Sequence, residues 1–416
     1  MQEGKLVDVI SKLGLQKSSV IQHMTSVIQP ILEKGILDYS IIHTALVEYF
    51  TIADKSSAAD VIQQLSPLLV QESSGIEEGP HSSKKRKNKK NRTKVPLLVR
   101  MISTRDGLKL GILCIKHGSA KDRKKIIKGI KDHIRKLALD RYGSLLLTCI
   151  ASVVDDTKLV SKIVIQQLKS MLKELLLDRN GRFPLLQLLH PQCLRYLGPE
   201  DLACLNLSVP SLCSKGEAEE TISGTGSEKD ADLGVENLQL TMGGKKDPSL
   251  RSRELLVESG LAEALIDTCI ENVNELLMSN FGKEVIFEVA VGGTNGVLKP
   301  LAERLDTLHK AIADLAALPK TADGSEENEH VFENFHSSRT IRKLVLDSPS
   351  FAATLWKVAL KGKCEVWAHG HSGKVVAAFL ESNDPKVRDL AKAELQPLVD
   401  HGVLKSHDSK QVKPDS

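Results

Sequence analysis

A short motif recurs along the chain at a nearly constant interval, and an apolar stretch follows each copy. The copies read T-R-D-G at Thr104–Gly107, D-R-Y-G at Asp140–Gly143 and D-R-N-G at Asp178–Gly181, so their glycines are 36 and 38 residues apart. Each apolar stretch is too short to fold alone, whereas stacked copies would bury a continuous core. We expect the glycine to close a tight turn and the polar residue to cap the next helix.

The rest of the chain favours an all-α fold, because helical periodicity recurs throughout and strand patterns are nearly absent. Weaker copies of the motif follow at Phe281-Gly282, at Ser338 in the glycine position and at Gly373, and another stands at Asp38–Ser40. With these copies the sequence predicts an α-solenoid of about seven units with a period of about 36 residues.

Changes in composition predict where the array is interrupted. We expect helical repeats in 1–72, a disordered basic insert in 73–95, central repeats in 96–213, a disordered Gly/Ser/Glu-rich linker in 214–250, C-terminal repeats in 251–403 and a disordered tail in 404–416. A shorter acidic loop, Lys320–Glu329, would interrupt the sixth unit.

The formal net charge of +4 conceals where the cations lie. One run without any acid holds Lys84, Lys85, Arg86, Lys87, Lys89, Lys90, Arg92 and Lys94. Such a run suits nuclear import and non-specific contact with phosphates, and its alternative is a solvated linker.

A second basic stretch runs from Lys116 to Lys136 and has a different pattern. Isoleucines at helical spacing predict an amphipathic helix whose outer face carries Lys121, Arg123, Lys124, Lys125 and Lys128. That face either binds phosphates or is simply solvated.

The sequence contains no convincing catalytic or membrane signal. Gly292–Gly296 lacks the preceding strand and following G-K-[ST] of a phosphate loop, and His369 and His371 have no further ligand nearby. No apolar run reaches eighteen residues, and the start lacks the regions of a signal peptide. The seven cysteines include no C-x-x-C pair and suggest buried thiols of a reducing compartment. We expect no enzyme, metal or cofactor.

The D-R-x-G turn followed directly by an apolar helix resembles the repeat of the Pumilio (PUF) family, in which that helix lines a concave RNA-binding surface. ENFHSSRTIRKLVLDSPSFAATLWKVAL and the WAHGHSGKVVAAFLE after it are similar to the C-terminal (CPL) region of Puf-A-type members. The resemblance spans roughly Gly35 to Val403. It implies a nucleolar protein that binds pre-rRNA and pre-ribosomal proteins during large-subunit assembly, with messenger repression in some members. It also implies an N-terminally shortened form, because such domains usually begin with further repeats.

In the sequence-reading members of this family, the first, second and fifth residues after the glycine contact a base. Here these triplets are Leu108/Lys109/Ile112, Ser144/Leu145/Thr148, Arg182/Phe183/Leu186, Lys283/Glu284/Phe287, Arg339/Thr340/Lys343 and Lys374/Val375/Ala378. None matches the base code, because side chains such as Leu and Ala cannot pair with base edges. The aromatic content of 3% likewise counts against extensive base stacking.

Cations nevertheless recur in the triplets, at Lys109, Arg182, Lys283, Arg339, Lys343 and Lys374. We expect them to contact RNA phosphates, so that binding depends steeply on salt and weakly on sequence. The alternative is that Lys and Arg are common at helix starts in any solenoid. A HEAT- or armadillo-type protein scaffold in the nucleus is the competing function.

Overall fold

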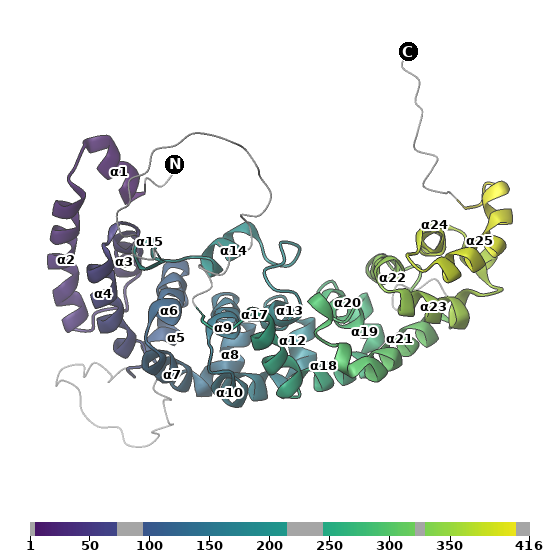
Figure 1. Ribbon diagram of the computed structural model, residues 1–416, viewed down its shortest axis with the longest axis horizontal. Helices are drawn as coiled ribbons and strands as arrows, with labels where there is room; N and C mark the ends of the chain where they lie inside the picture. The colour runs from purple at the N-terminus through teal and green to yellow at the C-terminus, as the bar shows by residue number, and fades with distance from the viewer. Residues whose placement is uncertain (1–4, 73–94, 214–243, 321–328, 405–416) are drawn as a thin grey trace, which may run out of the picture. The chain divides into compact units, whose positions relative to one another are not determined.

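The computed structural model describes residues 5–72, 95–213, 244–320 and 329–404, and every regular element in these ranges is a helix (Figure 1). The expectation of an all-α fold is confirmed. The basic run Lys84–Lys94 and the tail from Lys405 lie outside the described residues, as do most of the predicted linker and of the acidic loop.

The chain divides into two compact units. Unit 1 comprises the described parts of Met1–Gln167 and Leu197–Arg251, and unit 2 those of Leu168–Tyr196 and Ser252–Ser416. The third copy of the motif, Asp178–Gly181, therefore belongs to unit 2. The six predicted parts stay predictions.

The helices of unit 1 are α1 (Leu6–Leu13), α2 (Lys17–Glu33), α3 (Ser40–Ile52), α4 (Lys55–Leu68), α5 (Leu97–Met101), α6 (Arg105–His117), α7 (Ala120–Gly129), α8 (Ile134–Leu139), α9 (Arg141–Val153), α10 (Thr157–Val160), α14 (Pro199–Leu205) and α15 (Pro210–Cys213). Those of unit 2 are α12 (Leu172–Leu177), α13 (Phe183–Leu189), α18 (Leu261–Glu271), α19 (Val273–Met278), α20 (Gly282–Ala290), α21 (Ala302–Ala316), α22 (Phe335–Asp347), α23 (Pro349–Leu355), α24 (Gly370–Ala378) and α25 (Pro385–Asp400). Helices α11 (Gln166–Lys169) and α17 (Pro248–Arg253) each contain a boundary between the units.

Within each unit, the helix that follows a motif copy packs against the helix that follows the next copy. We call these the motif helices: α3, α6 and α9 in unit 1, and α13, α20, α22 and α24 in unit 2. In unit 1, α3 packs on α6 and α6 on α9; in unit 2, α13 packs on α20, α20 on α22 and α22 on α24. A second layer, formed in unit 2 by α18, α21 and α23, covers one side of these helices (Figure 1). The repeat therefore builds a two-layered core, as the apolar stretches require.

The predicted caps are present. Asp140 Oδ2 accepts hydrogen bonds from the backbone N–H groups of Tyr142 and Gly143, at 3.0 and 2.8 Å. Asp178 Oδ1 accepts them from Asn180 and Gly181, at 2.8 and 2.7 Å. Each carboxylate satisfies donors that the first helical turn leaves without a partner.

The reason that we gave for the motif glycine is wrong. Neither Gly107 nor Gly143 has a positive φ, and each lies inside the first turn of a helix. A Cβ at Gly107 would lie 2.0 Å from the carbonyl oxygen of Met101, and one at Gly143 would lie 2.4 Å from that of Leu137. The motif therefore needs glycine because two backbones approach closely there, and not because a turn is left-handed.

The same geometry corrects the register of the sixth unit. The cap there is Asn334, whose Oδ1 accepts from the N–H groups of His336 and Ser337, so Ser337 and not Ser338 occupies the glycine position. Ser337 Oγ donates a 2.6 Å hydrogen bond to the carbonyl of Val331. The close approach of the two backbone segments is therefore bridged by a hydrogen bond. In the seventh unit a Cβ at Gly373 would lie 2.5 Å from the carbonyl oxygen of Ala368, so Gly373 makes the close approach there.

Five of the described cysteines are buried, as predicted: Cys114, Cys149, Cys204, Cys269 and Cys364. Burial raises the pKa of the Cys149 thiol to about 11 and that of Cys114 to about 12. These thiols are therefore protonated and unreactive near neutral pH.

Candidate nucleic-acid interface

The corrected register changes which cations occupy the contact positions. Arg339 moves from the first to the second position after the glycine position, Arg342 becomes a fifth residue, and Lys343 falls outside the triplet. Arg339, Lys343 and Lys374 are all exposed on motif helices of unit 2. Whether the predicted cations contact phosphate stays a prediction, but the structure separates those with open side chains from those with protein partners.

In unit 1 the segment Pro199–Cys213 covers the contact positions. Its helix α14 packs on α6 and α9, and α15 packs on α4 (Figure 1). Glu200 pairs with Arg105 of α6, and Asp201 lies 3.7 Å from Arg141 of α9. The arginines at the first positions of α6 and α9 therefore face carboxylates of the same unit.

Lys109, the predicted phosphate ligand of α6, is paired as well. Its Nζ lies 2.8 Å from Oδ1 of Asp106, one turn earlier, and Asp106 also accepts a 2.8 Å hydrogen bond from Thr44. An RNA phosphate at Lys109 would have to compete with this carboxylate.

Arg182 is buried, and its guanidinium is used within the protein. Its Nε donates to Oε2 of Glu284 at 2.6 Å, and its charge lies 4.8 Å from the ring of Phe183 and 4.7 Å from that of Phe281. Only 6% of Arg182 is exposed. The residue joins two neighbouring motif turns, and its position leaves little surface for RNA. Phe183 is buried too.

Three of the four remaining predicted cations of unit 2 meet at one pocket, of about 600 Å³, whereas Lys374 does not line it. It is lined by Arg195, Tyr196, Lys283, Glu284, Phe287, His336, Arg339, Thr340, Arg342, Lys343 and Leu346. We call it the cationic pocket. Three of the predicted ligands, Lys283, Arg339 and Lys343, are thus brought together from α20 and α22.

Positive charge predominates in the cationic pocket. Its acid, Glu284, is already paired with Arg182. The pKa of Lys283 lies below its ordinary value because the amine is partly buried and because Arg339 and Lys343 are near, although Glu284 opposes the shift. Lys283 Nζ lies 2.8 Å from Nδ1 of His336, whose pKa is lowered by burial and by Lys283 and Arg339. An anion bound here would relieve this repulsion.

Several cationic groups of the pocket have no acidic partner. The structure gives Arg339 and Lys343 no ion pair with the residues that it describes, and the buried Nε of Arg342 has no hydrogen-bond partner among them. These donors match the oxygen atoms of a phosphate in kind and charge.

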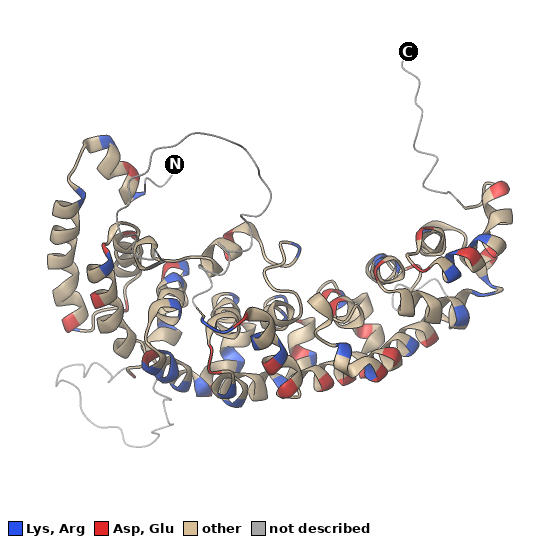
Figure 2. Ribbon diagram, in the orientation of Figure 1, with Lys and Arg blue, Asp and Glu red and all other residues tan. Residues whose placement is uncertain are grey.

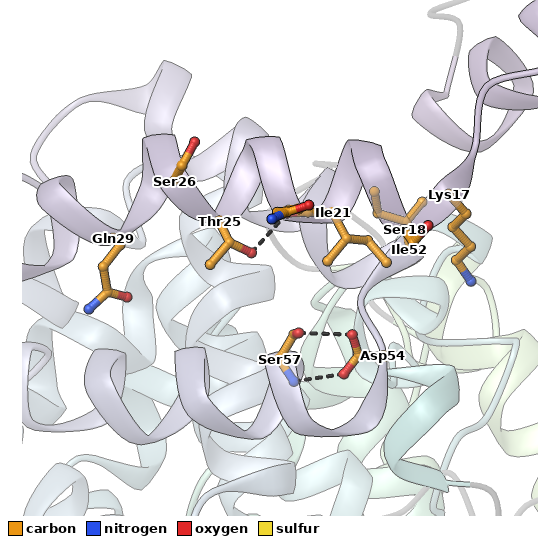
Figure 3. Close-up of a pocket in the computed structure, with 10 residues that line it drawn as sticks. Lys17, Ser18, Ile21, Thr25, Ser26, Gln29, Ile52, Asp54 and Ser57 are labelled. Carbon is orange, nitrogen blue, oxygen red and sulfur yellow. Dashed lines mark hydrogen bonds between the residues drawn. The ribbon is translucent and has the colours of Figure 1, made fainter.

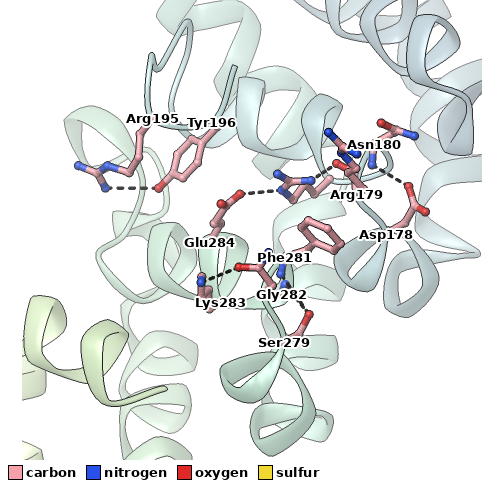
Figure 4. A network of polar contacts seen from close by, with 12 residues as sticks. Asp178, Arg179, Asn180, Arg195, Tyr196, Ser279, Phe281, Gly282, Lys283 and Glu284 are labelled. Carbon is pink, nitrogen blue, oxygen red and sulfur yellow. Dashed lines mark hydrogen bonds and ion pairs between the residues drawn. The ribbon is translucent and has the colours of Figure 1, made fainter. Parts of the chain in front are cut away.

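A buried acid holds Arg195 at the edge of the pocket. Glu288 of α20 is 2% exposed and accepts hydrogen bonds from the Tyr196 hydroxyl and from Nδ1 of His190. Arg195 lies 3.8 Å from the same carboxylate and 5.7 Å from the ring of Phe287. It also donates a hydrogen bond to the Tyr196 hydroxyl (Figure 4). The segment after α13 is thereby fixed to α20.

The five predicted cations of α7 do not all have the same environment. Lys121, Lys124, Lys125 and Lys128 are exposed. Lys and Arg positions gather along the ribbon of α7 (Figure 2). Arg123 instead donates to the carbonyls of Ile115 and Lys116, at 2.6 and 2.7 Å, and so caps the end of α6. Burial lowers its pKa. The lysines fit either of the two readings that we left open, whereas Arg123 is held by α6.

The sequence reasoning missed Arg195, His336, Arg342 and Phe335. Phe335, Arg339 and Arg342 are spaced four and three residues apart, which places them on one helical face, and this signal was available. Arg195 belongs to an irregular segment, for which no pattern predicts the position.

A second pocket, in unit 1, has a different character. It lies along α2 and α4 and is lined mainly by neutral side chains such as Ile21, Thr25 and Gln29 (Figure 3). Its acid, Asp54, caps α4 by accepting from Ser57, which lowers the Asp54 pKa. Lys17 is the single cation among its lining residues, so the pocket lacks the cluster of cations that a phosphate site needs.

The described ranges contain neither a membrane-spanning helix nor a cluster of metal ligands. None of the helices there is both long and apolar enough to cross a membrane. No three His, Cys, Asp or Glu residues within the same ranges gather closely enough to hold a metal ion.

The chain resembles known proteins in sequence and fold. Residues 234–350 match the family described as the CPL (NUC119) domain. Pumilio homolog 24 of Arabidopsis thaliana is 51% identical over 97% of this chain and 61% of its own length. The crystal structure of human Puf-A matches with a TM-score of 0.69 at 23% identity, over 95% of this chain and 66% of that one. The chain belongs to the Puf-A-type Pumilio proteins.

The Pumilio assignment confirms the resemblance drawn from the repeat turn and the C-terminal segment, and the fold is a Pumilio-type helical-repeat solenoid. Human Pumilio homolog 3 is 23% identical over 91% of this chain and 50% of its own length. The chain thus spans between half and two thirds of these relatives. Human Puf-A has also been solved in complex with DNA, and that structure matches with a TM-score of 0.68.

Proposed function

We propose that this chain binds RNA chiefly through the phosphate backbone, with little base specificity. The observation that carries the proposal is the cationic pocket of unit 2, where Lys283, Arg339 and Lys343 meet and Glu284 is neutralised by Arg182. The complex of human Puf-A with DNA supports nucleic acid as the ligand class.

Backbone contact explains why the triplets of this Pumilio protein depart from the base code. In the corrected register the first residues Leu108, Ser144 and Arg182 are buried, as is the fifth residue Thr148. Buried side chains cannot reach base edges, whereas exposed cations reach phosphates of any sequence.

For the biological setting we propose nucleolar ribosome assembly, with pre-rRNA and pre-ribosomal proteins as partners. The support is membership of the Puf-A-type proteins, together with the basic run Lys84–Lys94 in the sequence, which suits nuclear import. Translational regulation of messengers is the secondary role that the family resemblance implies. We propose a binding protein and not an enzyme.

Crosslinking of the protein to RNA in cells, followed by sequencing of the bound sites, tests this setting. We expect reads from pre-rRNA spacers and large-subunit rRNA. Reads confined to messenger untranslated regions would contradict the ribosomal role and favour translational control.

A nuclear protein scaffold is the second candidate, and exposed apolar side chains at the N-terminal end favour it. Val7, Leu13 and Leu15 are 42%, 67% and 46% exposed. Retention on immobilised RNA at moderate salt supports RNA binding. Association with partner proteins that survives nuclease treatment, without any retention on RNA, would support the scaffold instead.

A further inference from the structure

Phe335 differs from every other phenylalanine of the chain. It opens α22 and is 47% exposed, whereas Phe332, Phe351 and Phe379 are fully buried. Isolated exposed apolar residues are common on protein surfaces, so exposure alone indicates nothing. The surroundings of this ring are what matter.

Cationic and aromatic groups surround the exposed ring. The guanidinium carbon of Arg339 lies 4.1 Å from the ring centre of Phe335. The rings of His336 and His371 meet it edge-on, with centres 5.2 and 6.2 Å away. An apolar protein partner would gain little from such a surface, whereas a flat, polar aromatic group can stack on it.

The ring lies next to the cationic pocket. His336 and Arg339 contact Phe335 and also line that pocket, together with Lys283 and Lys343. A phosphate-binding region and an exposed stacking surface therefore share two residues. This pairing matches a nucleotide, which carries an anionic group and a planar base.

We propose that Phe335, with Arg339 beside it, stacks on an unpaired base of an RNA strand whose phosphates lie in the cationic pocket. The proposal rests on the proposed function and adds a preference for single-stranded RNA. In a duplex the base faces are covered by their neighbours, so only a single strand can present one to the ring. Phe335 stands outside the triplet, so the triplet register gives no indication of it.

The test compares the full chain with Phe335→Leu and Phe335→Tyr, using a short oligouridine and a hairpin duplex as probes. Leu keeps an apolar side chain and Tyr keeps the ring. We expect Phe335→Leu to weaken binding of the oligouridine about tenfold, as base–aromatic stacking predicts, and to leave the duplex unaffected. Phe335→Tyr should bind both probes as the natural chain does. A fluorescent adenine analogue in the oligouridine should be quenched by the natural chain and not by Phe335→Leu.

Lys343→Gln separates this proposal from the proposed function. It should weaken binding of both probes and lower the salt dependence, because it removes a phosphate contact and no stacking surface. If Lys343→Gln behaves so but Phe335→Leu weakens neither probe, or both equally, base stacking is wrong and backbone binding stands. If neither substitution affects either probe, and an acidic peptide binds instead, the proposed function fails.

Discussion

At the scale of single residues, the cations that the motif spacing places at equivalent positions have different structural roles. Arg182 is buried between two aromatic rings and paired with Glu284, so it holds two repeats together. Arg339 and Lys343 are exposed at the cationic pocket. The distinction depends on neighbours contributed by other helices, which the spacing of the motif does not report.

Replacing Arg182 by Met should lower the free energy of unfolding by about 3 kcal/mol, because Glu284 loses its partner in a mostly buried site. Arg182→Lys should also destabilise, since an ammonium lacks the plane that lies between the rings. Urea unfolding measures both. Lys173→Met, which breaks the exposed pair with Glu275, should cost under about 1 kcal/mol. Equal losses in Arg182→Met and Lys173→Met would contradict a buried role for Arg182.

His117 should make unit 1 sensitive to acid. Burial, with Lys116 and Arg123 nearby, lowers its pKa from 6.5 to about 4, and its Nε2 accepts the N–H of Val209. The unfolded chain therefore takes up the proton first, so stability is complete above pH 6.5 and falls as the pH drops toward 4. The loss should be roughly 3 kcal/mol in all.

The measurement is urea unfolding at several pH values for the natural chain and for His117→Gln. The amide oxygen of Gln can still accept from Val209 but does not titrate. The natural chain should lose more stability than His117→Gln between pH 6.5 and 4.5. Parallel profiles would show that His117 does not control this loss.

At the scale of elements, each motif copy combines a side chain that caps a helix with a small residue three positions later, where two backbone segments approach closely. The cap is Asp140 or Asp178 in the central copies, Thr104 or Asn334 elsewhere, and the residue three positions later lies against a backbone carbonyl. Ser337 shows that a small donor can replace glycine when its hydroxyl bonds to that carbonyl. Local chemistry thus sets the spacing between each of these motif helices and the segment that precedes it.

Gly143→Ala should destabilise unit 1 by about 3 kcal/mol, because the new Cβ would lie 2.4 Å from the Leu137 carbonyl oxygen and force the helices apart. Thermal and urea unfolding measure the change. Gly198→Ala is the matched control, because its Cβ would lie 3.9 Å from the nearest side-chain atom, and it should cost less than about 1 kcal/mol. A tolerated Gly143→Ala would contradict the close-approach account.

The sequence alone predicted the helical array, the caps and three of the cations that meet at the cationic pocket, because these follow from local periodicity and spacing. It did not predict the register at Ser337, because a serine that bonds to Val331 replaces the glycine there. Nor could it predict that α14 covers the motif helices of unit 1, or that Glu288 fixes Arg195, since both depend on contacts between distant segments.

At the scale of the whole molecule, the two units present different surfaces. In unit 1 the motif helices α6 and α9 lie under α14, whose acids face their arginines. In unit 2 the motif helices α20 and α22 form an open pocket with unpaired cations. We therefore expect unit 2 to dominate RNA binding by the described part of the chain, with the exposed lysines of α7 as a second surface.

The central claim is that the cationic pocket binds RNA phosphates, and the salt dependence of binding tests it most directly. The affinity for a short oligouridine is measured across a salt series for the natural chain and for Lys283→Gln/Arg339→Gln/Lys343→Gln. The control replaces the exposed lysines Lys357, Lys361 and Lys363 of unit 2 by Gln, which removes the same charge outside the pocket. Our account predicts that the slope of log affinity against log salt falls by about 2 in the pocket variant, at about 0.7 per lost contact, and hardly changes in the control. Equal slopes in the two variants would contradict it.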